Sequence, residues 1–316
     1  MKVLVTGGAG FIGSHIADAL LAANHDVLVL DDLSTGRRDN VPARANFVQG
    51  DIRDAELVAK VFADFQPNVV THQAAQTSVA VSTREPLRDA EVNILGSLNI
   101  LNQAVKHKVQ RVVFASTGGA IYGEVPEGER ATEERAPNPL SPYACSKFSV
   151  EKYLTAYGRE HGLRSTVLRY ANVYGPRQDP HGEAGVIAIF AQRIISGEPI
   201  QINARAQQGD AGCVRDYVFV GDVVKANLLA IEGKVARSPL NVCSGVATTT
   251  LELAQQMERA IGIAAVLRHG ARREGDVERS VLDPSAASSQ LGAPLPLSEG
   301  IARTVAWFRE RRERSE

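Results

Sequence analysis

A tyrosine and a lysine four residues apart are the first side chains in this sequence whose types and spacing suit chemistry. Tyr143 and Lys147 lie in SPYACSKFSVEKYL, whose pattern predicts a helix, so the two side chains share one face with Cβ atoms ~5–6 Å apart. A free tyrosine has a pKa of ~10, and service as a base near pH 7 needs a fall of roughly three units, or about 4 kcal/mol. An ammonium at ~5 Å supplies about 3 kcal/mol at an effective dielectric of ~20. The pair is a candidate proton-transfer site, although such spacing also arises by chance.

Two hydroxyl side chains add to this candidate site. Ser116 and Thr117 directly follow the apolar run Val112–Ala115, which predicts a buried strand. The carboxyl ends of strands in a doubly wound sheet are where such folds present groups to a ligand. We therefore expect these hydroxyls to belong to the same site.

A glycine-rich turn follows the first predicted strand. In GGAGFIG the glycines Gly7, Gly10 and Gly13 are spaced three apart, and Phe11 and Ile12 open a helix. Glycine permits a tight turn and lets backbone N–H groups approach a pyrophosphate at the positive end of a helix, while the third glycine allows close helix packing. Strand, glycine turn and helix in this order predict a dinucleotide site.

Acidic residues at the ends of the second and third predicted strands extend the dinucleotide prediction. Asp31, with Asp32 beside it, ends the second strand, where a carboxylate accepts hydrogen bonds from the adenosine ribose and repels a 2′-phosphate. The prediction is therefore NAD rather than NADP, although Arg37 and Arg38 lie nearby. Asp51 and Ile52 follow the third strand and suit an adenine contact, and an ordinary turn aspartate explains the position equally well.

The composition excludes several classes of partner. The chain has 316 residues, a formal net charge of -1 and 44% hydrophobic residues, which offers no argument for nucleic acid or a membrane surface. Three widely separated cysteines without metal-ligand spacing favour free thiols in a reducing compartment and predict no metal site. No apolar run is long enough to span a membrane, and no signal peptide precedes the first strand. We expect a cytoplasmic protein whose ligand is a small molecule.

The order of predicted elements indicates an α/β fold. Short apolar runs alternate with amphipathic stretches and predict a parallel, doubly wound sheet of the Rossmann type; the runs are Val3–Val5, Val27–Leu30, Phe47–Gly50, Val69–His72, Val112–Ala115 and Ser165–Tyr170. We expect a cofactor domain over residues 1–170, with returns near 217–245 at Tyr217–Val220 and Leu240–Val242. A smaller α/β substrate domain is expected over residues 171–316.

Motifs along nearly the whole chain resemble the extended short-chain dehydrogenases/reductases of the NAD-dependent epimerase/dehydratase family, and most closely their UDP-glucose 4-epimerase branch. The motifs are VTGGAGFIGSH, HQAA, EVNILGSLNIL, STGGAIYG, the Tyr143–Lys147 segment, LRYANVYGPR, VRDYVFVGDVV and RREGD. The chain departs from the usual pattern at Gln73, at Thr77 and in the long loop before Arg215.

The resemblance implies an isomerase that oxidises C4 of a UDP-hexose reversibly with tightly bound NAD. Thr117 and Tyr143 contact the reacting hydroxyl, and Lys147 binds the nicotinamide ribose and stabilises the phenolate. Ser116 completes the expected catalytic set. The implied cofactor contacts include Gln73, Ala74 and Ala75 of HQAA, Asn93, Tyr143, Lys147 and Tyr170. The implied substrate contacts, besides Thr117 and Tyr143, are Asn172, Val186, Gln201, Arg215, Arg273, Asp276 and Ser280.

Other functions of this family remain open to different degrees. A 4,6-dehydratase needs an acid/base pair directly after the catalytic threonine, and Gly118 and Gly119 stand there instead. A UDP-glucuronate epimerase or decarboxylase stays an alternative, and a non-catalytic NAD sensor on the same fold is a remote one. The small Ser280 favours acceptance of 2-acetamido sugars beside plain hexoses.

The resemblance also implies a homodimer. Members of the family pair through helices that correspond to residues 87–106 and 143–160, and both segments carry apolar residues beyond a single helix stripe. We therefore expect a two-fold dimer.

Overall fold

The computed structural model describes residues 1–181, 185–273 and 277–313, and these form two compact units. The first unit comprises Met1–Thr117, Ser141–Arg169 and Val223–Leu240. The second comprises Gly118–Leu140, Tyr170–Asp222 and the chain from Asn241 onward. This division differs from the expected boundaries at residues 118–140, which belong to the second unit.

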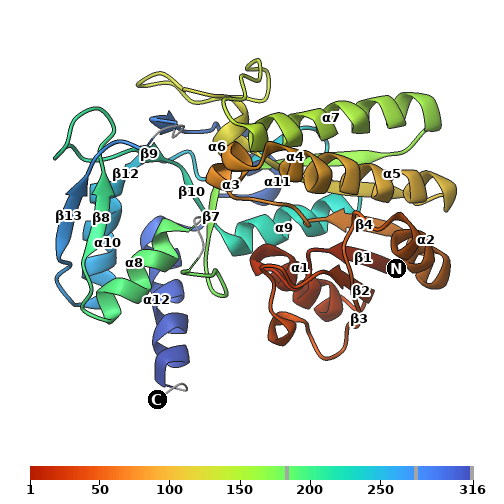
Figure 1. Cartoon of the computed structure of the whole chain (residues 1–316), viewed down its shortest axis with the longest axis horizontal. Helices are drawn as coiled ribbons and strands as arrows, with labels where there is room; N and C mark the ends of the chain where they lie inside the picture. The colour runs from red at the N-terminus through yellow and green to blue at the C-terminus, as the bar shows by residue number, and fades with distance from the viewer. Residues whose placement is uncertain (182–184, 274–276, 314–316) are drawn as a thin grey trace. The chain divides into compact units, whose positions relative to one another are not determined.

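A seven-stranded sheet in the order β11-β6-β5-β4-β1-β2-β3 organises the first unit (Figure 1). The strands are β1 (Lys2–Thr6), β2 (Asp26–Asp31), β3 (Asn46–Gln49), β4 (Val69–His72), β5 (Arg111–Thr117), β6 (Ser165–Tyr170) and β11 (Leu240–Val242). β1 pairs in parallel with β2 and β4, β2 with β3, and β4 with β5. The order reverses between β1 and β4, so the crevice of a doubly wound fold opens at their carboxyl ends. The predicted fold class is confirmed.

Helices cover both faces of this sheet. They are α1 (Phe11–Ala22), α2 (Ala55–Phe65), α3 (Val79–Arg84), α4 (Pro86–Ala90), α5 (Gly96–Lys106), α7 (Pro142–His161) and α9 (Val220–Ile231), with a 3₁₀ turn η1 (Arg38–Asn40) and a π-helical turn η2 (Glu91–Leu95). One face packs on α2, α5 and α7 through Leu4, Val70, Phe62, Ile100 and Leu154. The alternate strand residue Thr71 points to the other face, where its hydroxyl bonds Asn227 of α9.

The second unit is built from short sheets and helices. Its elements are α6 (Gly118–Ile121), β7 (Asn172–Tyr174), α8 (Val186–Ile195), β8 (Ile200–Asn203), β9 (Val214–Arg215), β10 (Tyr217–Phe219), β12 (Thr248–Thr249), α10 (Thr250–Ile261), β13 (Leu267–Gly270), β14 (Arg279–Ser280), α11 (Ser285–Leu291) and α12 (Leu297–Glu313). β13 pairs with β8, and β9 lies between β12 and β14.

One predicted strand lies elsewhere. The segment Tyr217–Val220 was expected to return to the cofactor domain, and this expectation is wrong, because the segment belongs to the second unit, where β10 pairs in parallel with β7. An apolar run of this length satisfies either sheet, and only the pairing distinguishes them. Leu240–Val242 does join the main sheet, as β11 beside β6.

Candidate active site

The glycine turn after β1 has the geometry of a dinucleotide loop. Gly7 adopts a positive φ of 69°, and a Cβ there would lie 2.6 Å from the backbone nitrogen of Ala74. A Cβ on Gly13 would lie 2.2 Å from the carbonyl oxygen of Gly7. Both positions therefore require glycine, because the contacting atoms belong to the backbone and cannot rotate away.

The start of α1 leaves its backbone donors open to an anion. The helix begins at Phe11 after Gly10, which offers no side-chain cap, and the first turn carries no acidic residue. The first N–H groups of a helix have no acceptor within the helix and form its positive end. This arrangement suits a pyrophosphate, as the sequence predicts.

Asp31 and Asp32 end β2 beside this loop. Asp31 is buried; its carboxylate accepts the backbone N–H groups of Ala9 and Leu33, each at 2.9 Å. Burial raises the pKa of Asp31, and these hydrogen bonds counteract the rise. Asp32 is exposed and accepts the backbone N–H and the hydroxyl of Ser34. Asp31 thus ties the glycine loop to β2, and the ribose contacts of both carboxylates stay predictions.

The two residues predicted to contact adenine, Asp51 and Ile52, each have neighbours that hold them in place. Asp51 accepts hydrogen bonds from the backbone and guanidinium of Arg53, which lowers its pKa. Ile52 is buried, and its side chain fills the space beside Gly96. Arg38 lies 4.5 Å from the centre of the Phe47 ring, so this arginine packs against β3.

The segment after β4 is held by a buried histidine and an amide. His72 contacts Thr6 at 2.6 Å and Ser97 at 2.9 Å, and burial lowers its pKa to about 3. Gln73 donates to Thr71 and to Asn227 of α9. These contacts fix the backbone that leads into Ala74 and Ala75. A polar residue fits at Gln73 because α9 offers it hydrogen-bonding partners.

Asn93 lies in the π-helical turn η2 and organises the same segment. Its side chain accepts the backbone N–H of Gln76 and donates to the Gln76 carbonyl, both at 2.9 Å. It also donates to Asp89 at 2.9 Å. Asn93 is buried and shapes the predicted cofactor loop through the Gln76 backbone. Its direct contact with the cofactor stays a prediction.

The helix that carries Tyr143 and Lys147, α7, begins with a capping serine and a proline. Ser141 caps α7 by accepting the N–H of Ala144, and Pro142 occupies the first helical position, where its missing N–H costs nothing. Tyr143 hydrogen-bonds Thr117 at the end of β5. Lys147 is 3% exposed, with its ammonium 4.5 Å from the centre of the Phe114 ring. The structure thus brings together Thr117, Tyr143 and Lys147.

The titration of this pair differs from the expectation. Burial of the phenol and the charge of Asp89 raise the pKa of Tyr143 to about 12, while the hydrogen bond from Thr117 lowers it. Burial lowers the pKa of Lys147 to about 8, and the charges of Asp89 and Glu151 raise it. The expectation that the Lys147 ammonium stabilises the phenolate of Tyr143 stays a prediction, and in the chain itself desolvation and an acidic residue on another helix act in the opposite direction.

Ser116 lies in a buried ion-pair network. Its hydroxyl donates to Glu151 of α7 at 2.6 Å, and Arg169 of β6 donates to both Glu151 oxygens at 2.9 and 2.5 Å. All three side chains are buried. This hydroxyl therefore joins β5 to α7, whereas Thr117 faces Tyr143. The sequence analysis missed Glu151, although its spacing of eight residues from Tyr143 places it on the same helix face.

The second unit positions several predicted substrate residues. Asn172 donates its side-chain amide to the carbonyl of Asp216 at 3.0 Å, and Gly119 leaves space beside this amide. Arg215 of β9 donates to the carbonyls of Val214 and Glu278. Ser280 of β14 pairs with Arg215 and is buried. Asn172 and Arg215 keep part of their surface exposed, whereas Ser280 is buried.

The remaining predicted residues occupy varied positions. Tyr170 ends β6 and is buried. Val186 is the first residue of α8 and is half-buried. Gln201 of β8 is exposed and donates to Asn203 at 2.6 Å. Arg273 is exposed, and Asp276 lies outside the described residues.

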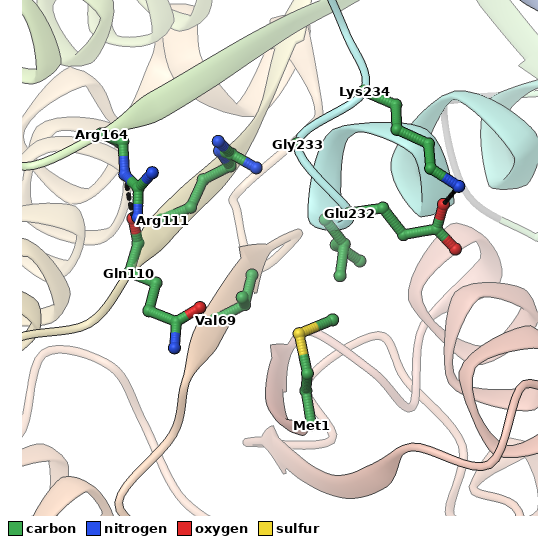
Figure 2. A pocket seen from close by; sticks show the side chains of 9 residues that line it. Met1, Val69, Gln110, Arg111, Arg164, Glu232, Gly233 and Lys234 are labelled. Carbon is green, nitrogen blue, oxygen red and sulfur yellow. Dashed lines mark hydrogen bonds and ion pairs between the residues drawn. The ribbon is translucent and has the colours of Figure 1, made fainter.

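A pocket of about 430 Å³ lies at the amino ends of β4 and β5, and Figure 2 shows side chains that line it. Val69 and Arg111, which start β4 and β5, line it together with Arg164, Ile231 and Glu232. Gly7 follows the carboxyl end of β1, and Thr117 is the last residue of β5. The pocket is therefore separate from the candidate catalytic residues.

Comparisons with known proteins agree with this geometry. The family model for the NAD dependent epimerase/dehydratase family matches residues 3–243. A putative UDP-glucose 4-epimerase from Methanocaldococcus jannaschii is 44% identical over 97% of this chain and 98% of its own length. The UDP-glucose 4-epimerase of Thermus thermophilus, solved with NAD, shares 52% identity over 98% of this chain and 99% of its own, with a TM-score of 0.95. The Thermotoga maritima enzyme, solved with UDP-glucose, shares 46% identity over 98% and 99%, with a TM-score of 0.92.

Two further findings concern the described residues only. None of their helices has the length and apolar character to cross a membrane. Within the same residues, no group of three or more histidine, cysteine or acidic side chains is arranged to hold a metal ion.

Proposed function

Because the chain belongs to the NAD dependent epimerase/dehydratase family and is an NAD-using enzyme of the epimerase type, we propose that it interconverts UDP-galactose and UDP-glucose at C4. The observation that carries this proposal is the placement of Thr117, Tyr143 and Lys147 at the carboxyl end of β5 and the first turns of α7. The similarity to enzymes solved with NAD and with UDP-glucose supports it.

The chain's own residues supply orientation and proton transfer. When bound, NAD reversibly accepts the hydride of C4, so that the sugar passes through a 4-keto form and no net oxidation results. Tyr143, as phenolate, would take the C4 hydroxyl proton, and it would return this proton to the same oxygen after the 4-keto sugar has turned over to present its opposite face. Thr117 orients the reacting hydroxyl and Tyr143. Lys147 binds the nicotinamide ribose, and its buried ammonium favours the phenolate.

Cofactor contacts are proposed at the glycine loop and around it. The loop and the open start of α1 hold the pyrophosphate, while Asp31 and Asp32 hold the adenosine ribose. The remaining predicted contacts are Asp51, Ile52, Gln73, Ala74, Ala75, Asn93 and Tyr170.

Substrate contacts are proposed in the second unit. Arg215 and Arg273 suit the diphosphate because a planar guanidinium donates two parallel hydrogen bonds. Asn172 and Asp276 complete the nucleotide contacts, while Val186 and Gln201 are proposed near the base. Each arginine is at least partly exposed, as a ligand contact requires.

Other UDP-sugars remain alternative substrates. Ser280 is small, which favours room for a 2-acetamido group, but it is only 2% exposed. A tyrosine there would overpack its surroundings, so Ser280→Tyr is a poor test of specificity. Comparison of kcat/KM for UDP-galactose, UDP-N-acetylgalactosamine and UDP-glucuronate with the unchanged protein discriminates directly among the alternatives.

The test of the main proposal uses the purified chain. Denaturation should release NAD, and incubation of the native protein with UDP-galactose should give UDP-glucose, followed by NMR of the anomeric protons. Tyr143→Phe should retain NAD and lose at least ~10²-fold in kcat. Bound NAD without formation of the C4 epimer in the unchanged protein would favour the sensor reading. Near-normal turnover by Tyr143→Phe would reject Tyr143 as the base.

A homodimer is proposed on the face formed by α4, η2 and α7. Leu87, Leu95 and Tyr153 are 80%, 55% and 41% exposed there, and exposed apolar side chains gathered on packed helices are typical of an interface. Leu87→Glu with Leu95→Glu should convert a dimer into a monomer in light scattering. Val266→Glu alters a 57% exposed residue of the other unit and serves as the matched control. A monomeric unchanged chain would reject the dimer.

A further inference from the structure

A buried carboxylate lies next to the catalytic helix. Asp89 of α4 is 0% exposed. One of its oxygens accepts the side-chain amides of Gln76 and Asn93 at 2.8 and 2.9 Å, and the other accepts the hydroxyl of Ser146 at 2.6 Å. Ser146 directly precedes Lys147 in α7. Three donors converge on this carboxylate, so the ionised form is well solvated by the protein.

The charge of Asp89 has no ion-pair partner at close range. All three donors are neutral, and no lysine, arginine or histidine nitrogen in the described part of the chain lies within 4.0 Å of its carboxylate. Glu151 differs, because Arg169 donates to both of its oxygens. A buried charge without a neutralising neighbour acts over longer distances than a paired one.

The catalytic pair lies within reach of this charge. Tyr143, Ser146 and Lys147 are spaced by three and four residues, so they share one face of α7, and Asp89 contacts that face through Ser146. Burial is the largest influence on both groups, raising the pKa of Tyr143 and lowering that of Lys147, and the charge of Asp89 pushes both pKa values upward. The contact of Asp89 with Ser146 and the upward effect of its charge on both pKa values thus point to the same neighbourhood.

We propose that Asp89 is a positioning residue that sets the pH range in which the Tyr143–Lys147 pair holds a single proton. The proposal rests on the function proposed above for Tyr143 and Lys147. Without a charged Asp89, the burial of Lys147 would disfavour its ammonium form, and the hydrogen bonds of Asp89 anchor the helix face that carries the pair.

The other groups around Lys147 do not replace this charge. Glu151 on α7 also raises the pKa of Lys147, but its carboxylate is paired with Arg169, and Asp89 is the acidic residue that acts on Tyr143 as well. His72 on β4 is neutral because burial lowers its pKa to about 3, and Phe114 on β5 offers only its ring. Around Tyr143, Thr117 contributes a neutral hydrogen bond. Asp89 is therefore the charge whose removal should shift both members of the pair in one direction.

The sign of the shift follows from the proton count. The working form has a phenolate and an ammonium, with a net charge of zero; one more proton makes the pair positive, and one fewer makes it negative. A nearby negative charge favours the positive form and disfavours the negative one. Removal of that charge should lower both apparent pKa values and move the whole bell-shaped pH profile of kcat/KM to lower pH. For a charge several ångströms away at a dielectric of ~20, the expected shift is on the order of one pH unit.

The test replaces the charge while keeping the shape. Asp89→Asn is isosteric and neutral, and Ser146→Ala is the matched control, because it removes a hydrogen bond from the same cluster and leaves the Asp89 charge. The first measurement is the pH profile of kcat/KM for UDP-galactose. The second needs no substrate: the phenolate absorbance of each protein is titrated, and the titration of its Tyr143→Phe counterpart is subtracted.

Asp89→Asn should move both limbs of the profile and the Tyr143 titration to lower pH by about one unit, whereas Ser146→Ala should leave their positions unchanged. A profile that falls in height without moving would give Asp89 a purely structural role and overturn the proposal. Asp89→Ser is the second neutral variant, and failure of both neutral variants to fold would overturn it too. A shifted phenolate titration in a protein without epimerase activity would reject the proposed function and keep this inference.

Discussion

Replacement of Glu151 by leucine should destabilise the chain strongly through Arg169. In the native protein the Arg169 guanidinium donates to both Glu151 oxygens, and the Ser116 hydroxyl donates to one of them. Leucine removes the carboxylate, so a buried positive charge loses its counter-charge and a buried hydroxyl loses its acceptor. Both groups are at least 90% covered, so water cannot readily replace the lost contacts.

The burial of this ion pair sets the expected loss in the free energy of unfolding. Removing one member of a buried ion pair costs about 3–5 kcal/mol, because the other charge stays desolvated. Replacing both members by apolar residues of similar volume is often neutral. Glu151→Leu combined with Arg169→Met should therefore recover most of the loss, with a coupling free energy of about 2–3 kcal/mol.

Urea unfolding followed by circular dichroism measures these differences. At a slope of ~3 kcal/mol per molar urea, Glu151→Leu should lower the midpoint by roughly 1–1.5 M. Arg169→Met supplies the other single variant of the cycle. Exposed Arg159, which contacts Glu160 at 3.4 Å, provides a matched surface control, and Glu160→Leu should change stability by less than ~1 kcal/mol. If the double variant lost as much as the two single variants together, the ion-pair account of this network would be refuted.

Three further predictions concern the site. Ser116→Ala should lower the free energy of unfolding by about 1–2 kcal/mol and leave most of kcat. Thr117→Val should keep the stability and lower kcat by ~10²-fold. The reverse pattern in urea unfolding and turnover would assign the catalytic role to Ser116. Gly13→Ala should abolish NAD retention in the purified protein, because its Cβ would meet the Gly7 carbonyl at 2.2 Å; an unchanged NAD content would reject the loop assignment. Asp31→Ala should weaken NAD binding and relax discrimination against NADP in calorimetric titration of the stripped protein, and equal preference before and after would remove Asp31 from the ribose site.

The sequence by itself determined the fold class and the cofactor loop. Gly7, Gly10 and Gly13 encode the turn locally, since the backbone approaches that demand glycine arise within one strand–turn–helix unit and one neighbouring strand. Tyr143 and Lys147 were predictable for the same reason, because a helix fixes the relation between residues four apart. The family assignment, confirmed by the comparisons, followed from motifs of this local kind.

Tertiary structure decided what depends on contacts between distant segments. β10 pairs with β7 rather than with the main sheet, a choice that a short apolar run does not encode. The sequence does not distinguish the roles of the neighbours Ser116 and Thr117. In the structure, successive side chains of a strand point to opposite faces, so Ser116 hydrogen-bonds Glu151 and Thr117 hydrogen-bonds Tyr143. Asp89 lies more than fifty residues before Tyr143, and nothing in the local sequence marks it; only the packing of α4 on α7 buries its carboxylate beside Ser146 and the face that carries Tyr143 and Lys147.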